Sequence, residues 1–205
     1  MNKCLSFMQQ DLLKELGTIG SGHAATAMAE LIGSKIMISV PTVALASFAE
    51  VASYVGGPEN VLSCVSLDVK GSVPGTVLIL FEEESALSLL RSILWGSEPD
   101  FKNLTELEQS AINEVGNILA GSYLSALADF SEQPIMAGVP SLAIDMAGAV
   151  LSAPLTKVGS VADVALLIQA EFITEKTSRG CVVFIPQPEA TDKLLKLFGV
   201  VANEK

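Results

Sequence analysis

The chain has 205 residues, of which 50% are hydrophobic and 17% charged, so it can bury a sizeable core and is not expected to be disordered. Its 23 acidic residues outnumber 12 basic ones, and the net charge of −11 argues against nucleic acid as a partner. The longest uncharged stretches are too short to span a membrane and contain proline. No signal peptide is recognisable at the start. We therefore expect a cytoplasmic protein with neither a membrane nor a nucleic-acid partner.

Side chains that commonly bind metals are few. His23 is the sole histidine, and Cys4, Cys64 and Cys181 lie far apart in the sequence. An odd, scattered set of cysteines is typical of reduced thiols in a core rather than of a disulfide framework or a zinc site. On a helical wheel His23 falls among apolar residues, so we expect it to be half-buried. We expect no metal site in this chain.

An internal repeat organises the sequence. Residues 11–44 align without a gap with residues 110–143, at a separation of 99 positions. The identical pairs include Glu15/Glu114, Gly17/Gly116, Gly22/Gly121 and Pro41/Pro140. This period is far longer than that of a solenoid repeat. The pattern predicts a single domain over 1–205 with pseudo-two-fold symmetry, made of two repeats at about 9–96 and 105–200.

Each repeat is predicted to contain a long helix, strands and a shorter helix. The long helices are expected at 9–32 and 106–130, and a capping box of Thr105 and Glu108 marks the start of the second. Strands rich in Val, Ile and Leu are expected at 35–44, 60–69, 76–81, 133–143, 146–152, 163–174 and 181–186. Flanking amphipathic helices are expected at 83–95 and 188–198. The hairpin-like spacing of the later strands favours an α+β fold with a largely antiparallel sheet.

Polar residues line the outer face of both long helices. At 100° per residue, Ser110, Glu114 and Asn117 fall within about 60° of one another, and Gly121 follows one turn later. The first helix presents a corresponding set, Asp11, Glu15, Thr18 and Gly22. Such residues are usually only solvated, but here the Glu and the Gly recur in both copies. A bare glycine on an outer face lets the surface of a partner approach closely.

This pattern resembles a known family. Asp or Ser, three residues, Glu, two residues, Asn, twenty-two residues and Pro mark the chemotaxis response-regulator phosphatases of the CheC, CheX and FliY group. The second copy matches at every spacing, with Ser110, Glu114, Asn117 and Pro140. The first copy matches with Asp11, Glu15 and Pro41, but has Thr18 in place of Asn. The resemblance covers the whole chain, and two copies in a chain of this length are similar to CheC.

The resemblance implies hydrolysis of the aspartyl phosphate on the response regulator CheY, which ends the signal. The regulator supplies its own Mg²⁺ and lysine, so we expect no cofactor in this chain, and the phosphatase has only to position a water in line. Asn117 is expected to orient that water through its carboxamide, and Glu114 to pair with the regulator's lysine. The remaining outer-face residues are expected to contact the partner, namely Ser110 and Gly121 on one helix and Asp11 and Gly22 on the other.

Thr18 is the departure from the family pattern. Its hydroxyl is shorter than a carboxamide and lacks an amide donor, so the site of Glu15 and Thr18 is expected to be weak or silent. Glu15 is still able to dock a regulator there. An alternative hypothesis is therefore a non-catalytic module that sequesters CheY-phosphate or the receptor deamidase CheD. A flagellar-switch component is less favoured, because we expect no further domain after Lys205.

Asp145 interrupts the apolar stretch 141–147. One interpretation is a charge that guards an edge strand against pairing with other chains. The other is a docking patch, because an exposed apolar strip around one acid suits a partner surface. CheC proteins also bind CheD, so the resemblance makes Asp145 a predicted contact for that partner.

Overall fold

The computed structural model of the protein describes residues 7–158, 165–173, 177–197 and 199. Within these ranges, six helices surround one seven-stranded sheet. In chain order the elements are α1 (Phe7–Ile32), β1 (Met37–Ala46), α2 (Phe48–Tyr54), β2 (Val61–Gly71), β3 (Gly75–Glu82), α3 (Glu83–Ile93), α4 (Glu106–Ser131), β4 (Ile135–Ala137), β5 (Ser141–Met146), α5 (Ala147–Val158), β6 (Ala165–Ile173), β7 (Thr177–Pro186) and α6 (Pro188–Leu197). None of the described helices is long and apolar enough to cross a membrane.

The two halves of the chain interlock within the sheet. The strand order is β1-β6-β7-β3-β2-β4, and β5 also pairs with β2. Strands that follow the long helices thus pair with a strand of the other half: β1 with β6, and β5 with β2. At the centre β3 lies beside β7, with Leu78 opposite Val183. All pairs among the described strands are antiparallel, which confirms the predicted α+β fold with a largely antiparallel sheet. The matched pairing of the two halves on either side of β3 and β7 confirms the pseudo-two-fold symmetry.

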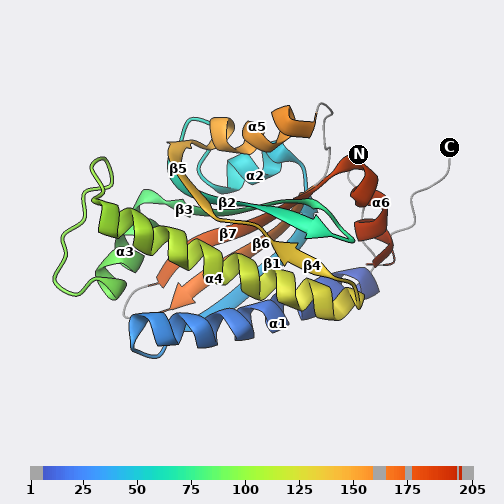
Figure 1. The fold of residues 1–205 in the computed structure, drawn as a ribbon, viewed down its shortest axis with the longest axis horizontal. Coiled ribbons are helices and arrows are strands. Elements are labelled where there is room, and N and C mark those ends of the chain that lie inside the picture. The colour runs from blue at the N-terminus through green and yellow to red at the C-terminus, as the bar shows by residue number, and fades with distance from the viewer. Residues whose placement is uncertain (1–6, 159–164, 174–176, 198, 200–205) are drawn as a thin grey trace.

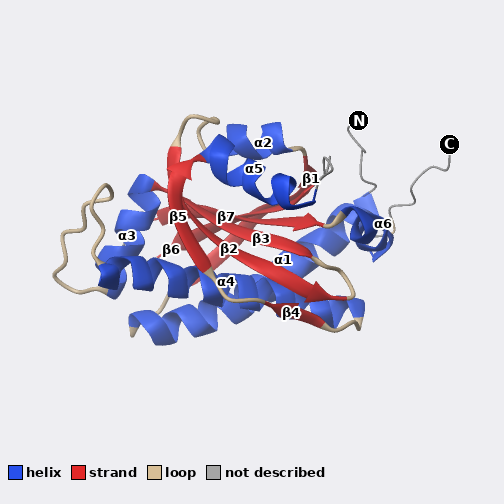
Figure 2. Cartoon of the chain, turned by 45° about the horizontal axis from the view of Figure 1, so that its top comes forward, coloured by secondary structure: helices blue, strands red, loops and turns tan. Residues whose placement is uncertain are grey.

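Helices cover both faces of this sheet. In Figures 1 and 2, α1 and α4 lie along one face, and α2 and α5 lie together on the other. The larger hydrophobic cluster lies under α1, α3, α4 and α6 and includes Leu16, Leu90, Val115 and Leu194. A smaller cluster under α2 and α5 includes Val51 and Leu151. Burying one such side chain fully contributes about 1.5–3 kcal/mol, so the two clusters hold the sheet between its helices.

The two repeated prolines interrupt the strands that follow the long helices. The register of β1 shifts between Ser39 and Thr42, on either side of Pro41. Pro140 lies in the gap between β4 and β5, so the single strand predicted at 133–143 is two strands. Proline has no backbone N–H to donate to a neighbouring strand, which explains why both interruptions fall at this residue.

Two short helices differ from the sequence-based expectation. The predicted strand at 146–152 is wrong, because α5 begins at Ala147. Its Ala147-Gly148-Ala149 start has low strand propensity, and a side chain at Gly148 would press on the carbonyl oxygen of Pro58. The other helix, α2, was not predicted, although Ser47 and Glu50 form a capping box at its start. The two helices occupy equivalent positions, α2 after β1 and α5 after β5.

Candidate functional site

The capping box at the start of α4 forms as predicted. The backbone N–H of Glu108 donates to Oγ1 of Thr105 at 3.3 Å, and the Glu108 carboxylate accepts from the Thr105 backbone N–H at 2.7 Å. Two of the N–H groups that a helix start leaves without partners are thereby satisfied. The cap therefore sets where α4 begins.

Glycines on the inner side of both long helices bring them close to the sheet. A Cβ at Gly116 would overlap the side chain of Val65 on β2. A Cβ at the repeat-equivalent Gly17 would lie 2.8 Å from Cγ2 of Val43 on β1. Gly20 likewise leaves room for the ring of Tyr123, where α1 packs against α4. These contacts anchor one side of each helix, so the opposite side is presented to solvent.

The residues predicted for the second-repeat site lie together on the outer face of α4. Ser110 and Glu114 are exposed, and Asn117 is half-buried one turn beyond Glu114. Among the described residues, none of these three side chains takes part in a hydrogen bond or an ion pair. A Cβ at Gly121 would meet nothing within 4 Å, so this glycine has no packing role inside the protein. The helix therefore offers a carboxylate and a carboxamide that are free to bind another molecule.

The outer face of α1 has the same layout with one chemical difference. Asp11, Glu15, Thr18 and Gly22 are all exposed, and a Cβ at Gly22 would also meet open space. Thr18 donates its hydroxyl to the carbonyl oxygen of Lys14 at 2.9 Å. This bond within the helix occupies the one donor of Thr18, whereas Asn117 keeps its whole amide available.

The two polar faces lie on neighbouring helices that run in opposite directions (Figure 1). Contact between Gly20 and Tyr123 places the middle of α1 beside the middle of α4. Glu15 and Thr18 precede that crossing on α1, and Glu114 and Asn117 precede it on α4. The two sets therefore lie toward opposite ends of the helix pair and form two separate candidate sites.

Other predicted residues lie apart from these sites. His23 is exposed on α1, so its predicted half-buried position is wrong: the buried face of the helix is centred near Gly17 and Ala24, about 100° or more from His23 on the helical wheel. Asn113, which was not predicted, has a buried amide oxygen without a hydrogen-bond partner one turn before Asn117. The only indication in the sequence that Asn113 is partly buried is its place beside the apolar Ile112 and Val115.

The described cysteines are buried in the smaller core cluster. Burial raises the pKa of Cys64 to about 12 and also raises the pKa of Cys181, so both remain neutral thiols at physiological pH. Cys4 lies outside the described residues. No group of three or more His, Cys, Asp or Glu side chains in the described part of the chain is arranged to hold a metal ion.

Asp145 belongs to a different surface. It lies opposite Leu62 in the β2–β5 pair, and Leu62 points into the cluster under α2 and α5. Because opposite residues of an antiparallel pair share one face of the sheet, Asp145 lies on the face away from α4. Its Oδ1 accepts a hydrogen bond from the backbone N–H of Met146 at 2.7 Å, and the side chain is exposed.

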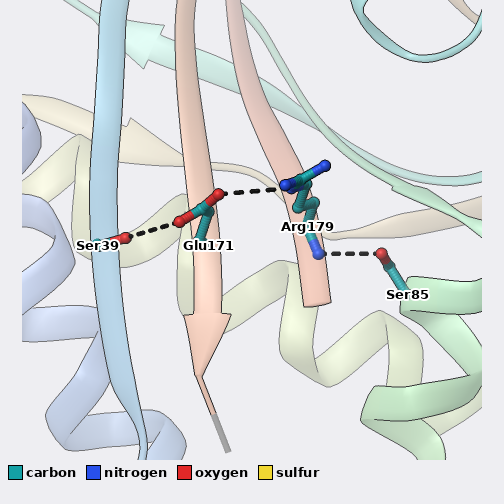
Figure 3. A network of polar contacts seen from close by, with 4 residues as sticks. All are labelled: Ser39, Ser85, Glu171 and Arg179. Atoms are coloured by element: carbon teal, nitrogen blue, oxygen red, sulfur yellow. Dashed lines mark hydrogen bonds and ion pairs between the residues drawn. The ribbon is translucent and has the colours of Figure 1, made fainter. Parts of the chain in front are cut away.

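A cavity of about 250 Å³ opens beside the end of α2, lined in part by Tyr54, Glu82 and Cys181. Figure 3 shows the polar contacts at its rim. Glu171 lies between Ser39, whose hydroxyl is 3.3 Å from one carboxylate oxygen, and Arg179, whose Nε is 3.4 Å from the other. Both carboxylate oxygens of Glu171 therefore have a polar partner. Burial is the main cause that raises the pKa of Tyr54, so the phenol group that lines the cavity is neutral.

Comparison with known proteins places the repeat in a family. A model of the CheC-like family matches residues 8–45 and 107–144, two segments that are again 99 positions apart. The chain is 32% identical over 196 residues to the CheY-P phosphatase CheC of Bacillus subtilis (strain 168), covering 93% of this chain and 94% of that protein.

Solved structures share the fold. Thermotoga maritima FliY superposes with a TM-score of 0.72 at 23% identity, covering 96% of this chain and 98% of that one. A chain of the Borrelia burgdorferi CheX-CheY-BeF3-Mg²⁺ complex has a TM-score of 0.51 at 17% identity, covering 82% of this chain and 96% of that one. Because the family pattern occurs twice and the identity to CheC extends over nearly the full length of both proteins, the chain belongs to the CheC-like family.

Proposed function

We propose that this protein is a phosphatase that hydrolyses the aspartyl phosphate of a CheY-type response regulator, using the outer face of α4. The observation that carries the proposal is the pair of Glu114 and Asn117, one helical turn apart, facing outward and without partners among the described residues. The name of the Bacillus subtilis relative, a CheY-P phosphatase, supports the same reaction. So does the structural neighbour in which a CheX is bound to CheY and BeF3.

Asn117 positions the water. Its carboxamide oxygen accepts a hydrogen bond from a water molecule placed in line with the bond to be broken. The water oxygen attacks phosphorus, the bond between phosphorus and the aspartyl oxygen breaks, and the regulator's aspartate returns as a carboxylate. Both protons of the water leave with the inorganic phosphate, as H2PO4⁻, which can release one of them to solvent. The Mg²⁺ that neutralises the phosphoryl charge belongs to the regulator, so this chain needs to supply geometry only.

Glu114 aligns the regulator. A carboxylate that is exposed and unpaired attracts a cation, and the lysine beside a regulator's acyl phosphate is such a cation. Pairing there sets the position of Asn117, one turn further along α4, relative to the phosphorus atom. Ser110 and Gly121 extend the contact at either end, and the bare glycine lets the partner's surface come close.

The first site docks a regulator without efficient hydrolysis. Asp11 and Glu15 are exposed, and Gly22 is open like Gly121. Thr18 is tied to its own helix through Lys14 and has no carboxamide. This difference favours one working site, and it is the specific observation behind the alternative of a module that only sequesters CheY-phosphate.

Loss of acyl phosphate from an excess of phosphorylated CheY tests the proposal. Wild type is expected to turn over many times, and Asn117→Ala to lose about 10²-fold or more, the range for losing the correct position of a reacting group. Asn113→Ala is the matched control, because it removes the same kind of side chain one turn earlier on α4, where the amide oxygen is buried. Half of the wild-type rate in Asn117→Ala would contradict a single working site. Binding without turnover by wild type would leave the sequestering module.

We also propose Asp145 as a contact for CheD. The support is its exposed position on the sheet face away from α4, which allows a second partner to bind without covering Glu114 and Asn117. Asp145→Lys is expected to weaken CheD binding about tenfold or more while acyl-phosphate hydrolysis stays at the wild-type rate. Pull-down and calorimetry with purified CheD measure the first quantity. Unchanged CheD binding would discard this contact.

A further inference from the structure

Each long helix begins with an exposed apolar side chain. Leu107, in the first turn of α4, is 65% exposed, and Met8, in the first turn of α1, is 74% exposed. The two residues are 99 positions apart, the same separation that relates Glu15 to Glu114. The duplication has therefore kept a large apolar residue at one position in both copies, although the structure buries it in neither.

Leu107 has no role in the fold that would explain it. The start of α4 is capped by Thr105 and Glu108, and neither bond involves the Leu107 side chain. The core contacts of the helix begin further on, at Ala111 and Ile112. A single exposed leucine is ordinary on a protein surface, but one that recurs at the repeat-equivalent position requires a reason.

The position of Leu107 supplies that reason. At 100° per residue, Leu107, Glu114 and Gly121 fall within about 40° of one another along α4. From Leu107 to Gly121 the stripe is about 21 Å long at about 1.5 Å per residue, which fits within one protein–protein contact of ordinary size. Beside Asn117, the partly buried Ile118 adds apolar surface, as Ile19 does on α1.

We propose that Leu107 is an apolar anchor for the phosphorylated response regulator, buried on docking one turn before Ser110. This inference rests on the proposed function, because it assigns the same partner to the same face of α4. The polar pair is then responsible for alignment and chemistry, and Leu107 contributes affinity. An apolar side chain that a partner covers completely adds affinity, because the desolvated core of an interface is more apolar than its polar rim.

The test compares three variants by the kinetics of acyl-phosphate loss. Leu107→Ser is expected to raise KM about tenfold with kcat unchanged, because an interaction made equally in the bound and transition states affects binding alone. Leu107→Met keeps an apolar side chain of similar size and is expected to stay within about twofold of wild type. Met136→Ser is the matched control: Met136 is 59% exposed, but it lies opposite Lys70, on the sheet face away from α4.

Binding to CheY loaded with BeF3 separates this inference from the proposed function. If wild type binds but does not hydrolyse, the phosphatase proposal fails, and a roughly tenfold higher Kd for Leu107→Ser still supports the anchor. If wild type hydrolyses and Leu107→Ser has the wild-type KM and Kd, the anchor alone is wrong. An equal weakening in Met136→Ser, or no binding by wild type, would also overturn it.

Discussion

Asn117 and Thr18 occupy equivalent positions and differ in what they can offer a partner. Asn117 is half-buried and has no internal hydrogen bond among the described residues, so its oxygen and both amide hydrogens are available. Thr18 is exposed, but its hydroxyl already donates a hydrogen bond to the backbone carbonyl oxygen of Lys14. Under the proposed function, this one side chain distinguishes the site on α4, which we expect to orient water, from the site on α1, which we expect only to dock.

Thr18→Asn in the Asn117→Ala background tests this difference. The substituted carboxamide stands one turn from Glu15, as Asn117 stands from Glu114, so it is expected to restore hydrolysis to at least about tenfold above the Asn117→Ala rate. Acyl-phosphate loss under multiple turnover measures it. Thr18→Val is the control, because it removes the hydroxyl without supplying an amide. No gain in Thr18→Asn would show that the face on α1 does not place a regulator productively.

At the level of the elements, glycines on opposite sides of one helix have opposite roles. Gly116 lets α4 approach Val65 on β2, whereas Gly121 faces open space. The same division holds in α1, where Gly17 lies against β1 and Gly22 is open. The inner glycines allow close packing within the fold, whereas the outer ones have no such role.

Two glycine-to-alanine variants of α4 separate these roles. Gly121→Ala is expected to stabilise the protein by about 0.5–1 kcal/mol, because alanine favours a helix and meets nothing, while KM for phosphorylated CheY rises. Gly116→Ala is expected to destabilise it by about 1–3 kcal/mol through overlap with Val65. Urea unfolding measures both free energies. An unchanged KM in Gly121→Ala would remove this glycine from the docking surface.

The whole molecule is held together by exchange between its halves. β1 pairs with β6, β5 pairs with β2, and α1 packs against α4, so each half completes the sheet of the other. Edge strands without their neighbours would leave backbone N–H and C=O groups exposed to self-association. We therefore expect the duplicated sequence to form one folding unit.

This exchange predicts that neither half folds alone. Fragments 1–96 and 105–205 are each expected to lack a cooperative thermal transition and to bind a hydrophobic dye, because each loses a strand partner and half of the helix pair. Mixing the two is expected to restore the transition, as followed by circular dichroism. A cooperative transition in either isolated fragment would show that the repeats are independent domains.

The candidate site could be predicted because its evidence is local. The separation of 99 residues, the capping box at Thr105 and the outward stripe from Ser110 to Gly121 all depend on spacing within one helix or on the comparison of two. A helix has a period of about 3.6 residues whatever surrounds it, so the sequence alone determined which side chains share a face. It also determined the antiparallel α+β class.

The tertiary structure decided what depends on distant neighbours. The pairing of β1 with β6 and of β5 with β2 joins segments from different halves of the chain, and strand order has no local signal. The stretch 146–152 is mostly apolar, so its pattern does not distinguish a helix from a strand, and in the folded molecule it forms α5, which packs beside α2. Only the packed molecule shows that Leu107 is exposed, that Gly116 is covered and that Asp145 lies on the opposite face, because burial is a property of what surrounds a residue.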